Sequence, residues 1–424
     1  MKTLKNLSKV FPFFTIVAIL VFSVSWSDIF GQTVFEAPAK KLIDFGWHSP
    51  SIQDLQGSLE LYENAPFDGL SIKMSQDVGG GNVFMVKDWQ NVTTEAKHRE
   101  IKYFASMKSS PTLTDNFLVL YGASQMDWFS DGDWLQVEDQ LRFAAQLAQT
   151  AHCRGILWDP EPYKPGKNPW KYVEQENNAR YSFDQYYIKV RKRGAQFIET
   201  LQNEFPGIII FSLRELSDWQ QGSPFSGSLL PVTQPEQTLK ELNDAWWGLH
   251  PAFYVGILDA IDINTQFIDG NEEAYYYTSA LEYFQIRTTL MDDAQAFIPP
   301  ELRQKYHGSF RLGHAISAEY IAGNWLGMSP FPYRLTGQAT MMTSAEKAKW
   351  FEHNAYYALR SSDEYAWLYT EEMNWWNGDK VPEGFKEALL SAKHKVKTGQ
   401  PLGFEIKEII QAAQDKADKF YQNK

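Results

Sequence analysis

Short apolar runs alternate with longer amphipathic segments from residue 40 almost to the end of the chain. The apolar runs have the length and composition of buried parallel strands, whereas the longer segments repeat their apolar positions at helical spacing. The pattern predicts strands at residues 41–45, 67–74, 116–121, 155–158, 207–213, 266–270, 310–316 and 365–369. It predicts helices at residues 51–63, 93–108, 134–152, 182–205, 239–263, 274–297, 344–359, 384–395 and 405–421.

The regular alternation of strands and helices favours a parallel sheet, because a crossover between parallel strands needs a helix-length connection. The predicted strands and helices fit an α/β fold, a single (β/α)8 barrel with long loops at the C-terminal ends of its strands. No linker of biased composition and no internal repeat divides the chain. We therefore expect one domain over residues 33–424 that ends in a helical tail. Residues 253–258 also fit a strand, so their structure stays open.

The first residues have the pattern of a secretory signal peptide. Lysines near the N-terminus precede an apolar run at residues 10–24, and small residues follow at 25–27. The apolar run is short for a membrane span. We expect residues 1–32 to be a signal peptide, with cleavage as early as residue 27, and a secreted or periplasmic mature chain without a stable membrane span. An uncleaved membrane anchor is the alternative.

Two carboxylates follow the predicted strand at residues 155–158, in the sequence Asp159-Pro160-Glu161-Pro162. The prolines remove backbone donors and so end the hydrogen bonding of the strand. Two residues apart on an extended backbone, Asp159 and Glu161 point to the same side. Like charges held this close raise the pKa of one carboxyl group, which suits a general acid. The alternative is a strand-end turn whose acids cap a helix or pair with Arg or Lys.

Polar and charged residues follow most of the predicted strands, and many stand beside Trp or Tyr. They are His48, Asp127, Asp131, Asp133, Arg214, Glu215, Asp269, Glu272, Glu319, Glu371 and Glu372. In a (β/α)8 barrel the active site lies at the C-terminal ends of the strands, so we expect these side chains to converge. Convergent carboxylates and aromatic rings are what a glycosidase uses, because one acid protonates the leaving oxygen and the rings hold the sugar.

The composition narrows the choice of partners. Lys and Arg total 40 against 52 Asp and Glu, a formal net charge of −12, which argues against nucleic acid as a partner. The chain has 15 Trp and 21 Tyr, most of which an ordinary core explains. The Trp pairs at 246–247 and 375–376 and the Trp residues beside acids exceed what packing needs, and this favours a carbohydrate partner. Cys153 is the only cysteine, so the chain has no internal disulfide and no cysteine-based metal site. The glycine motifs of dinucleotide and phosphate binding do not occur, and we predict no cofactor.

Over residues 40–380 this organisation resembles the TIM-barrel glycoside hydrolases. The Asp159-x-Glu161 pair at the end of the fourth predicted strand is similar to the D-x-E of chitinase-like glycosidases. That resemblance implies that Glu161 is the general acid and that Asp159 orients it or a substrate acetamido group. Residues 155–158 stand where the chitinase pattern has further acids, which argues against an N-acetylated substrate. A resemblance to retaining families with a nucleophile after the seventh strand would give that role to Glu319.

The sequence thus predicts an exported glycoside hydrolase that degrades an oligo- or polysaccharide by carboxylate general acid/base chemistry. The predicted catalytic residues are Glu161, Asp159, Asp269 and Glu371. The predicted substrate-binding residues are Trp47, His48, Trp158, Tyr163, Arg214, Trp219, Glu272, Glu319 and Trp375. For Asp269, Glu319 and Glu371, a structural ion pair or a bond to a sugar hydroxyl is an equal alternative. Arg214 fits either a charged or sulfated sugar or a salt bridge with Asp159 or Glu215.

Two other functions fit the same pattern. A non-catalytic carbohydrate-binding surface protein would use the same barrel and the same aromatic rings. A metal-dependent barrel hydrolase would use histidines at strand ends, where His48 and His314 stand, or a calcium or magnesium site among Asp127, Asp131 and Asp133. A further carboxylate across the barrel mouth from Asp159 and Glu161 would favour the glycosidase over the binding protein.

Overall fold

A computed structural model describes residues 39–163, 165–219, 242–293, 297–323 and 338–422. The expected signal peptide at residues 1–32 lies outside these residues. None of the helices in the described part of the chain is long and apolar enough to cross a membrane.

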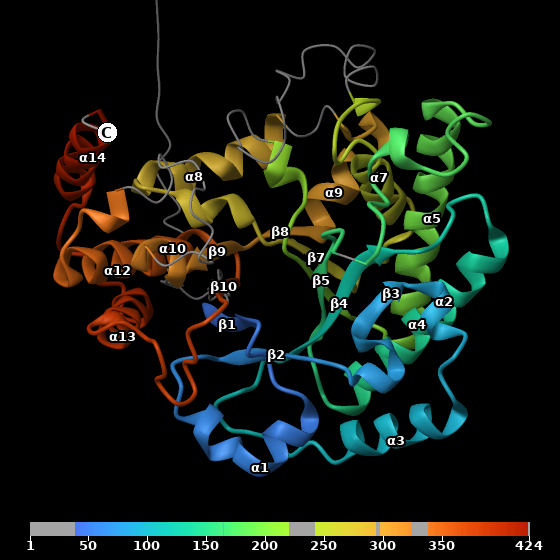
Figure 1. The fold of residues 1–424 in the computed structure, drawn as a ribbon, viewed down its shortest axis with the longest axis horizontal. Coiled ribbons are helices and arrows are strands. Elements are labelled where there is room, and N and C mark those ends of the chain that lie inside the picture. Colours follow the sequence, from blue (N-terminus) through green and yellow to red (C-terminus); the bar gives the residue numbers. More distant parts are fainter. Residues whose placement is uncertain (1–38, 164, 220–241, 294–296, 324–337, 423–424) are drawn as a thin grey trace, which may run out of the picture. The chain divides into compact units, whose positions relative to one another are not determined.

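Parallel strands form a barrel with helices around it (Figure 1). In chain order the barrel strands are β1 (Lys41–Gly46), β2 (Gly69–Ile72), β4 (Phe117–Ser124), β5 (Gly155–Asp159), β6 (Ile209–Ser212), β7 (Gln266–Asp269), β8 (Phe310–Leu312), β9 (His314–Ser317) and β10 (Tyr365–Thr370). A short strand, β3 (Asn82–Phe84), also pairs with β4. The strands β8 and β9 are two parts of one run broken at Gly313, with β8 on β7 and β9 on β10.

The barrel closes because the first strand pairs with the last. β1 and β10 are in register from Lys41 beside Tyr365 to Gly46 beside Thr370. With β8 and β9 taken as one strand, the order around the barrel follows the order along the chain. The predicted (β/α)8 fold is therefore confirmed, and each predicted barrel strand is present.

Helices connect the strands and cover the outside of the barrel. They are α1 (Ile52–Glu63), α2 (Val86–Trp89), α3 (Thr94–Ala105), α4 (Asp131–Thr150), α5 (Phe183–Glu204), α7 (His250–Ala260), α8 (Ala280–Thr288), α9 (Arg303–Ser309), α10 (Ala318–Ala322), α12 (Ser344–Ser361), α13 (Phe385–Lys397) and α14 (Lys407–Gln422). Two 3-10 turns, η4 (Leu216–Trp219) and η5 (Glu272–Tyr276), follow β6 and β7.

Local sequence explains where several helices begin. Ser182 and Gln185 form a capping box at the start of α5, as Ser279 and Glu282 do for α8. Within the described part of the predicted helix at 239–263, α7 begins at His250, where a proline in the first turn favours a helix start. That helix also covers residues 253–258, which excludes the alternative of a strand there.

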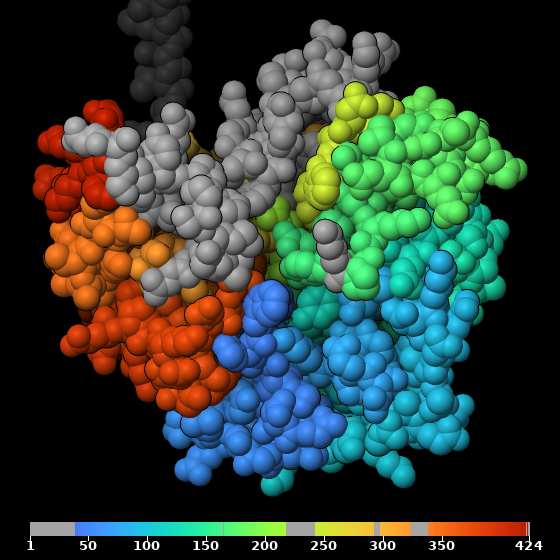
Figure 2. All heavy atoms as spheres, in the orientation of Figure 1, coloured from blue at the N-terminus to red at the C-terminus, as the bar shows by residue number. Residues whose placement is uncertain are grey.

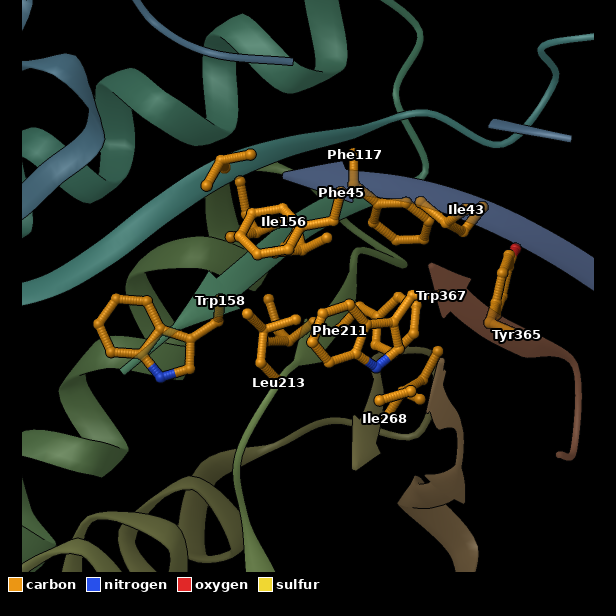
Figure 3. Packing of buried hydrophobic residues seen from close by; sticks show 14 of the residues in the cluster. Ile43, Phe45, Phe117, Ile156, Trp158, Phe211, Leu213, Ile268, Tyr365 and Trp367 are labelled. Atoms are coloured by element: carbon orange, nitrogen blue, oxygen red, sulfur yellow. The ribbon is translucent and has the colours of Figure 1, made fainter. Parts of the chain in front are cut away.

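Aromatic side chains fill the interior of the barrel (Figure 3). The ring of Phe117 lies edge-on to Phe211 and to Tyr365, with centroids 5.7 and 5.5 Å apart. Nearer the C-terminal ends, Trp367 contacts Phe45 and donates a hydrogen bond from Nε1 to the carbonyl oxygen of Gly270 at 2.8 Å. Because the interior is filled with rings, polar chemistry is restricted to the strand ends and the loops that follow them.

Candidate active site

The acid pair predicted from the sequence lies at the C-terminal end of β5. Asp159 is the last residue of the strand and only 1 % exposed, whereas 28 % of the Glu161 side chain is exposed. The backbone N–H of Glu161 donates a hydrogen bond to Asp159 Oδ1 at 3.0 Å. The pair therefore has one buried member and one member that solvent or a substrate can reach.

The hydroxyl group of Tyr163 joins the two acids. Its oxygen lies 2.9 Å from Asp159 Oδ2 and 2.7 Å from Glu161 Oε2. The ring of Tyr163 packs edge-on against Tyr121 of β4 and is 43 % exposed. Burial, followed by the charge of Glu161, raises the pKa of Asp159 to about 8. The raised pKa makes Asp159 the member of the pair that more readily holds a proton.

Arg214 brings the ends of β5, β6 and β7 together. Its Nε lies 2.8 Å from Glu161 Oε1 and 2.9 Å from Glu272 Oε2, and the guanidinium is buried. The Glu272 side chain is 16 % exposed. The sequence suggested a charged sugar or a salt bridge with Asp159 or Glu215, whereas the structure places Arg214 in salt bridges with Glu161 and Glu272. Two partly exposed carboxylates face each other across one buried cation.

Asp269 has a different environment from the one the sequence suggested. Its Oδ2 accepts the backbone N–H of Ser217 at 2.9 Å. Its Oδ1 accepts the Ser217 hydroxyl and the N–H of Asn271. Burial raises the pKa of Asp269 to about 6. Because both oxygens accept protein donors, Asp269 holds the turn after β6 against the end of β7, which fits the structural alternative for this residue.

A second group of buried acids lies at the ends of β9 and β10. Glu319 Oε1 accepts three backbone N–H groups, from Glu371 at 2.9 Å and from Glu372 and Met373 at 3.0 Å. Glu371 Oε1 accepts the hydroxyl of Tyr369 at 3.0 Å. Within the described residues, the Oε2 atoms of Glu319 and Glu371 are buried without a hydrogen-bond partner. Burial raises the pKa of Glu371 to about 7.

Asp44, in the middle of β1, belongs to this second group and was missed in the sequence. Burial and then the charge of Glu319 raise its pKa to about 8, while Lys73 opposes the shift. Phe45 packs against Trp367 inside the barrel, so its neighbour Asp44 lies on the outer face of the strand. An aspartate within an apolar predicted strand was the only available signal, and it gave no position relative to the other acids.

Aromatic residues connect the two groups of acids. Tyr369 accepts a hydrogen bond from Trp47 Nε1 at 2.9 Å, and its ring stacks on Tyr275 with centroids 5.7 Å apart. Burial, the charge of Glu371 and, less strongly, that of Glu272 raise the pKa of Tyr369. The Trp47 ring is 69 % exposed. Both groups of acids therefore lie around one set of rings, with an exposed indole at its edge.

Segments far apart in the sequence share this side of the molecule. In Figure 2 the blue N-terminal surface meets the green surface and the orange-red surface near the centre of the view. Beside Trp47, His48 is exposed in the turn after β1. The strand ends thus assemble a site from the beginning, the middle and the end of the chain.

Two predicted substrate-binding residues are buried in the structure. Trp158 is fully buried on the outside of the barrel, with its ring 5.3 Å from that of Phe197 in α5. Trp375 is buried and stacks on Phe351 of α12 at 5.9 Å. Both rings are committed to the helix layer because neighbouring strand and loop residues alternate between barrel and helices. The side chain of Trp219 lies outside the described part of the chain.

The predicted alternative of a cation site at Asp127, Asp131 and Asp133 is not supported. Asp131 pairs with Lys189 at 3.0 Å and with Arg193. Asp133 accepts the N–H of Asp127 at 2.9 Å. Among the described residues, no group of three or more His, Cys, Asp or Glu side chains is arranged to hold a metal ion. These acids fasten the start of α4 to α5 instead.

Comparisons with known proteins give weak similarities. No protein-family model matches the chain, and no curated protein matches it. Among solved structures, a sugar phosphate isomerase/epimerase from Parabacteroides distasonis is 13 % identical, with TM-score 0.34 over 88 % of this chain and 98 % of that one. A family GH18 chitinase from Chromobacterium violaceum is 9 % identical, with TM-score 0.37 over 84 % of each chain. A GH5-4 broad specificity endoglucanase from an uncultured bacterium is 9 % identical, with TM-score 0.38 over 85 % of this chain and 87 % of that one. Similarities this weak carry no argument about the reaction.

Proposed function

We propose that the chain is an exported glycoside hydrolase that cleaves an oligo- or polysaccharide at the ends of β5, β6 and β7. The observation that carries the proposal is the pairing of buried Asp159 with partly exposed Glu161, opposite a second carboxylate at Glu272. A glycosidase needs one proton donor and one carboxylate on either side of the scissile bond. Export rests on the sequence pattern of the first residues alone.

Glu161 is the member of the β5 pair that touches the substrate, since Asp159 is buried beneath it. In this role Glu161 protonates the leaving oxygen, and Glu272 stabilises the positive charge that develops on the sugar ring. Glu161 Oε1 and Glu272 Oε2 both contact Nε of Arg214. The distance between these two oxygens therefore cannot exceed the sum of the two contact distances. Such a short separation favours the retaining mechanism, in which the two groups are about 5–5.5 Å apart.

A neutral sugar fits this site better than an anionic one. Arg214 already contacts two carboxylates, which balance its charge, so it does not attract a sulfate or uronate group. The neighbouring acids Glu371 and Glu319 would repel such groups. Trp47 offers an exposed ring of the kind that stacks on the apolar face of a neutral sugar.

The proposal is tested by hydrolysis of aryl glycosides and oligosaccharides of neutral sugars, with wild type beside Glu161→Gln and Glu272→Gln. Glu372→Gln is the matched control, because this exposed acid pairs with Lys380 at 3.0 Å outside the acid pair. We expect each site variant to lose about 100-fold or more in kcat and the control to lose nothing measurable. Full turnover by Glu161→Gln would refute the site, and sugar binding without turnover in the wild type would favour a binding protein.

A further inference from the structure

The contacts of Tyr163 raise a question of proton placement. One hydroxyl oxygen lies 2.9 Å from Asp159 Oδ2 and 2.7 Å from Glu161 Oε2, and both distances are those of good hydrogen bonds. A tyrosine hydroxyl has a single proton to donate, whereas two ionised carboxylates would both require a donor. Both contacts are satisfied at once when one of the two carboxyl groups is protonated and donates to the tyrosine oxygen.

The surrounding contacts decide which carboxyl group that is. Asp159 Oδ1 already accepts the backbone N–H of Glu161, which leaves Oδ2 to carry a proton. Glu161 Oε1 contacts the Arg214 cation, which favours a carboxylate on that residue. The arrangement is therefore a directed chain, in which Asp159 donates to Tyr163 and Tyr163 donates to Glu161.

We propose that Tyr163 passes a proton from Asp159 to Glu161 during glycosidic cleavage, an inference that rests on the proposed function. As the bond from the sugar carbon to the leaving oxygen breaks, the Glu161 carboxylate takes up a proton from Tyr163 and passes it to that oxygen, while the Glu272 carboxylate stabilises the positive charge on the sugar carbon. The Tyr163 hydroxyl proton moves to Glu161, and the Asp159 proton moves to the tyrosine oxygen. One proton has then left Asp159, which becomes a carboxylate, and Tyr163 is neutral again. When water adds to the sugar carbon, its released proton returns to Asp159 by the same chain.

Other charged and titratable groups around this chain come from three neighbouring strand ends. Tyr121 of β4 packs against Tyr163, Arg214 follows β6, and Glu272 follows β7. Arg214 opposes the rise in the pKa of Asp159, and Glu272 contributes to the raised pKa of Tyr163. Tyr163 is a positioning residue in this account, because it acts on the substrate through Glu161.

The test is a double-mutant cycle on Tyr163→Phe and Asp159→Asn, assayed with a 4-nitrophenyl glycoside and a 2,4-dinitrophenyl glycoside of the same sugar. Tyr172→Phe is the control, since this hydroxyl donates only to the carbonyl oxygens of Asn178 and Tyr181 among the described residues. On the 4-nitrophenyl substrate we expect each single variant to lose about 10- to 100-fold in kcat, and the double variant to lose no more than either. On the 2,4-dinitrophenyl substrate, whose leaving group needs little protonation, the losses are smaller.

The pH dependence of kcat distinguishes the relay from a purely structural role of Tyr163, because a structural role would leave the shape of the profile unchanged. In the wild type kcat falls as pH rises through the pKa of Asp159, and this limb of the profile disappears in Tyr163→Phe. Additive losses in the double variant, or an unchanged basic limb, overturn the relay. A Glu161→Gln variant with full activity overturns the proposed function itself, whereas an inactive Glu161→Gln beside a fully active Tyr163→Phe overturns the relay alone.

An infrared titration decides the geometry without any substrate. The carbonyl band of protonated Asp159 is the band that the wild type has near neutral pH and that Asp159→Asn lacks. We expect this band to shift in Tyr163→Phe, because the carboxyl O–H loses its acceptor, and to stay unchanged in Tyr172→Phe. A band that does not move in Tyr163→Phe contradicts the hydrogen bond on which the relay depends.

Discussion

At the scale of single residues, burial raises the pKa of several carboxyl groups in and around the site. Burial raises the pKa of both Asp44 and Asp159 to about 8. An aspartate in the unfolded chain has a pKa of about 3.9, so between these values the folded state binds protons that the unfolded state does not. Stability is therefore greatest below the unfolded pKa and falls as pH rises toward the folded pKa. Such acids oppose folding at neutral pH, which is typical of groups retained for function.

Asp44→Asn tests this consequence away from the proposed substrate contacts. The amide keeps the shape of the side chain but removes the group that must be ionised or protonated. Between about pH 5 and pH 8, we expect the free energy of unfolding of the variant to fall less steeply with pH than that of the wild type. The two slopes should differ by up to about 1.4 kcal/mol per pH unit. Urea denaturation at both pH values measures it, with the exposed Asp379→Asn as control. Parallel pH dependence in Asp44→Asn and wild type would show that Asp44 does not hold a proton.

Single residues were predictable from the sequence where local pattern sufficed. Asp159 and Glu161 could be found because an apolar strand ends in two acids, and strand geometry places them on one side. The sequence could not predict which of the two acids is buried and which is exposed, because this depends on the residues that pack over the end of the strand. The pairing of Glu272 with Arg214 likewise depends on loops whose reach no local pattern encodes.

At the scale of elements, the helices beside β6 pack with their backbones in contact. A Cβ on Gly194 of α5 would lie 2.0 Å from the carbonyl oxygen of Phe253 in α7. A Cβ on Gly256 of α7 would lie 1.9 Å from the carbonyl oxygen of Arg191 in α5. These helices precede and follow β6, the strand that leads to Arg214.

Gly194→Ala tests the importance of this helix contact. The added methyl group meets backbone rather than a flexible side chain, so α5 and α7 must separate. We expect a loss of about 1–3 kcal/mol in the free energy of unfolding, measured by urea denaturation. Gly57→Ala in α1 is the matched control, because nothing lies within 4 Å of the added Cβ, and it should change stability by less than about 1 kcal/mol. Equal effects of the two changes would contradict tight packing of α5 on α7.

The elements themselves were largely predictable, whereas their ends were not. Periodicity placed every barrel strand, because strands buried on both faces are short, apolar and bounded by turn residues. The helix predicted at 344–359 ends at Ser361 in the structure, and its cap is Thr343, since the side chain of Glu346 reaches back to that residue. Trp158 and Trp375 were assigned to the site because the sequence alone does not tell which side of a strand end faces the barrel.

At the scale of the whole molecule, closure joins the two ends of the described chain. β1 pairs along its length with β10, and Lys40 Nζ donates to the carbonyl oxygens of Ser362 and Asp363 at 2.6 and 2.9 Å. The site depends on this closure, because Trp47 after β1 donates to Tyr369 of β10. A barrel closed in this way leaves no group of strands that could keep its structure independently.

A protein that ends at residue 361 tests this dependence, because it lacks β10, which leaves β9 without its strand partner and β1 paired only with β2. We expect the full chain to unfold in urea with coincident transitions in tryptophan fluorescence and far-ultraviolet circular dichroism. The shortened protein should show no cooperative transition. Separate transitions in the full chain, or a cooperative one in the shortened protein, would contradict a single closed barrel as the folding unit.

The central claim is that Glu161 transfers the proton in glycosidic cleavage at the end of β5. The most direct measurement is calorimetric binding of an intact oligosaccharide substrate to Glu161→Gln, together with its turnover of the same sugar. The glutamine keeps the size and polarity of the side chain but has no acid proton to transfer. The account predicts binding within a few-fold of wild type and a loss of about 100-fold or more in kcat. Wild-type turnover by a variant that binds the sugar would contradict it.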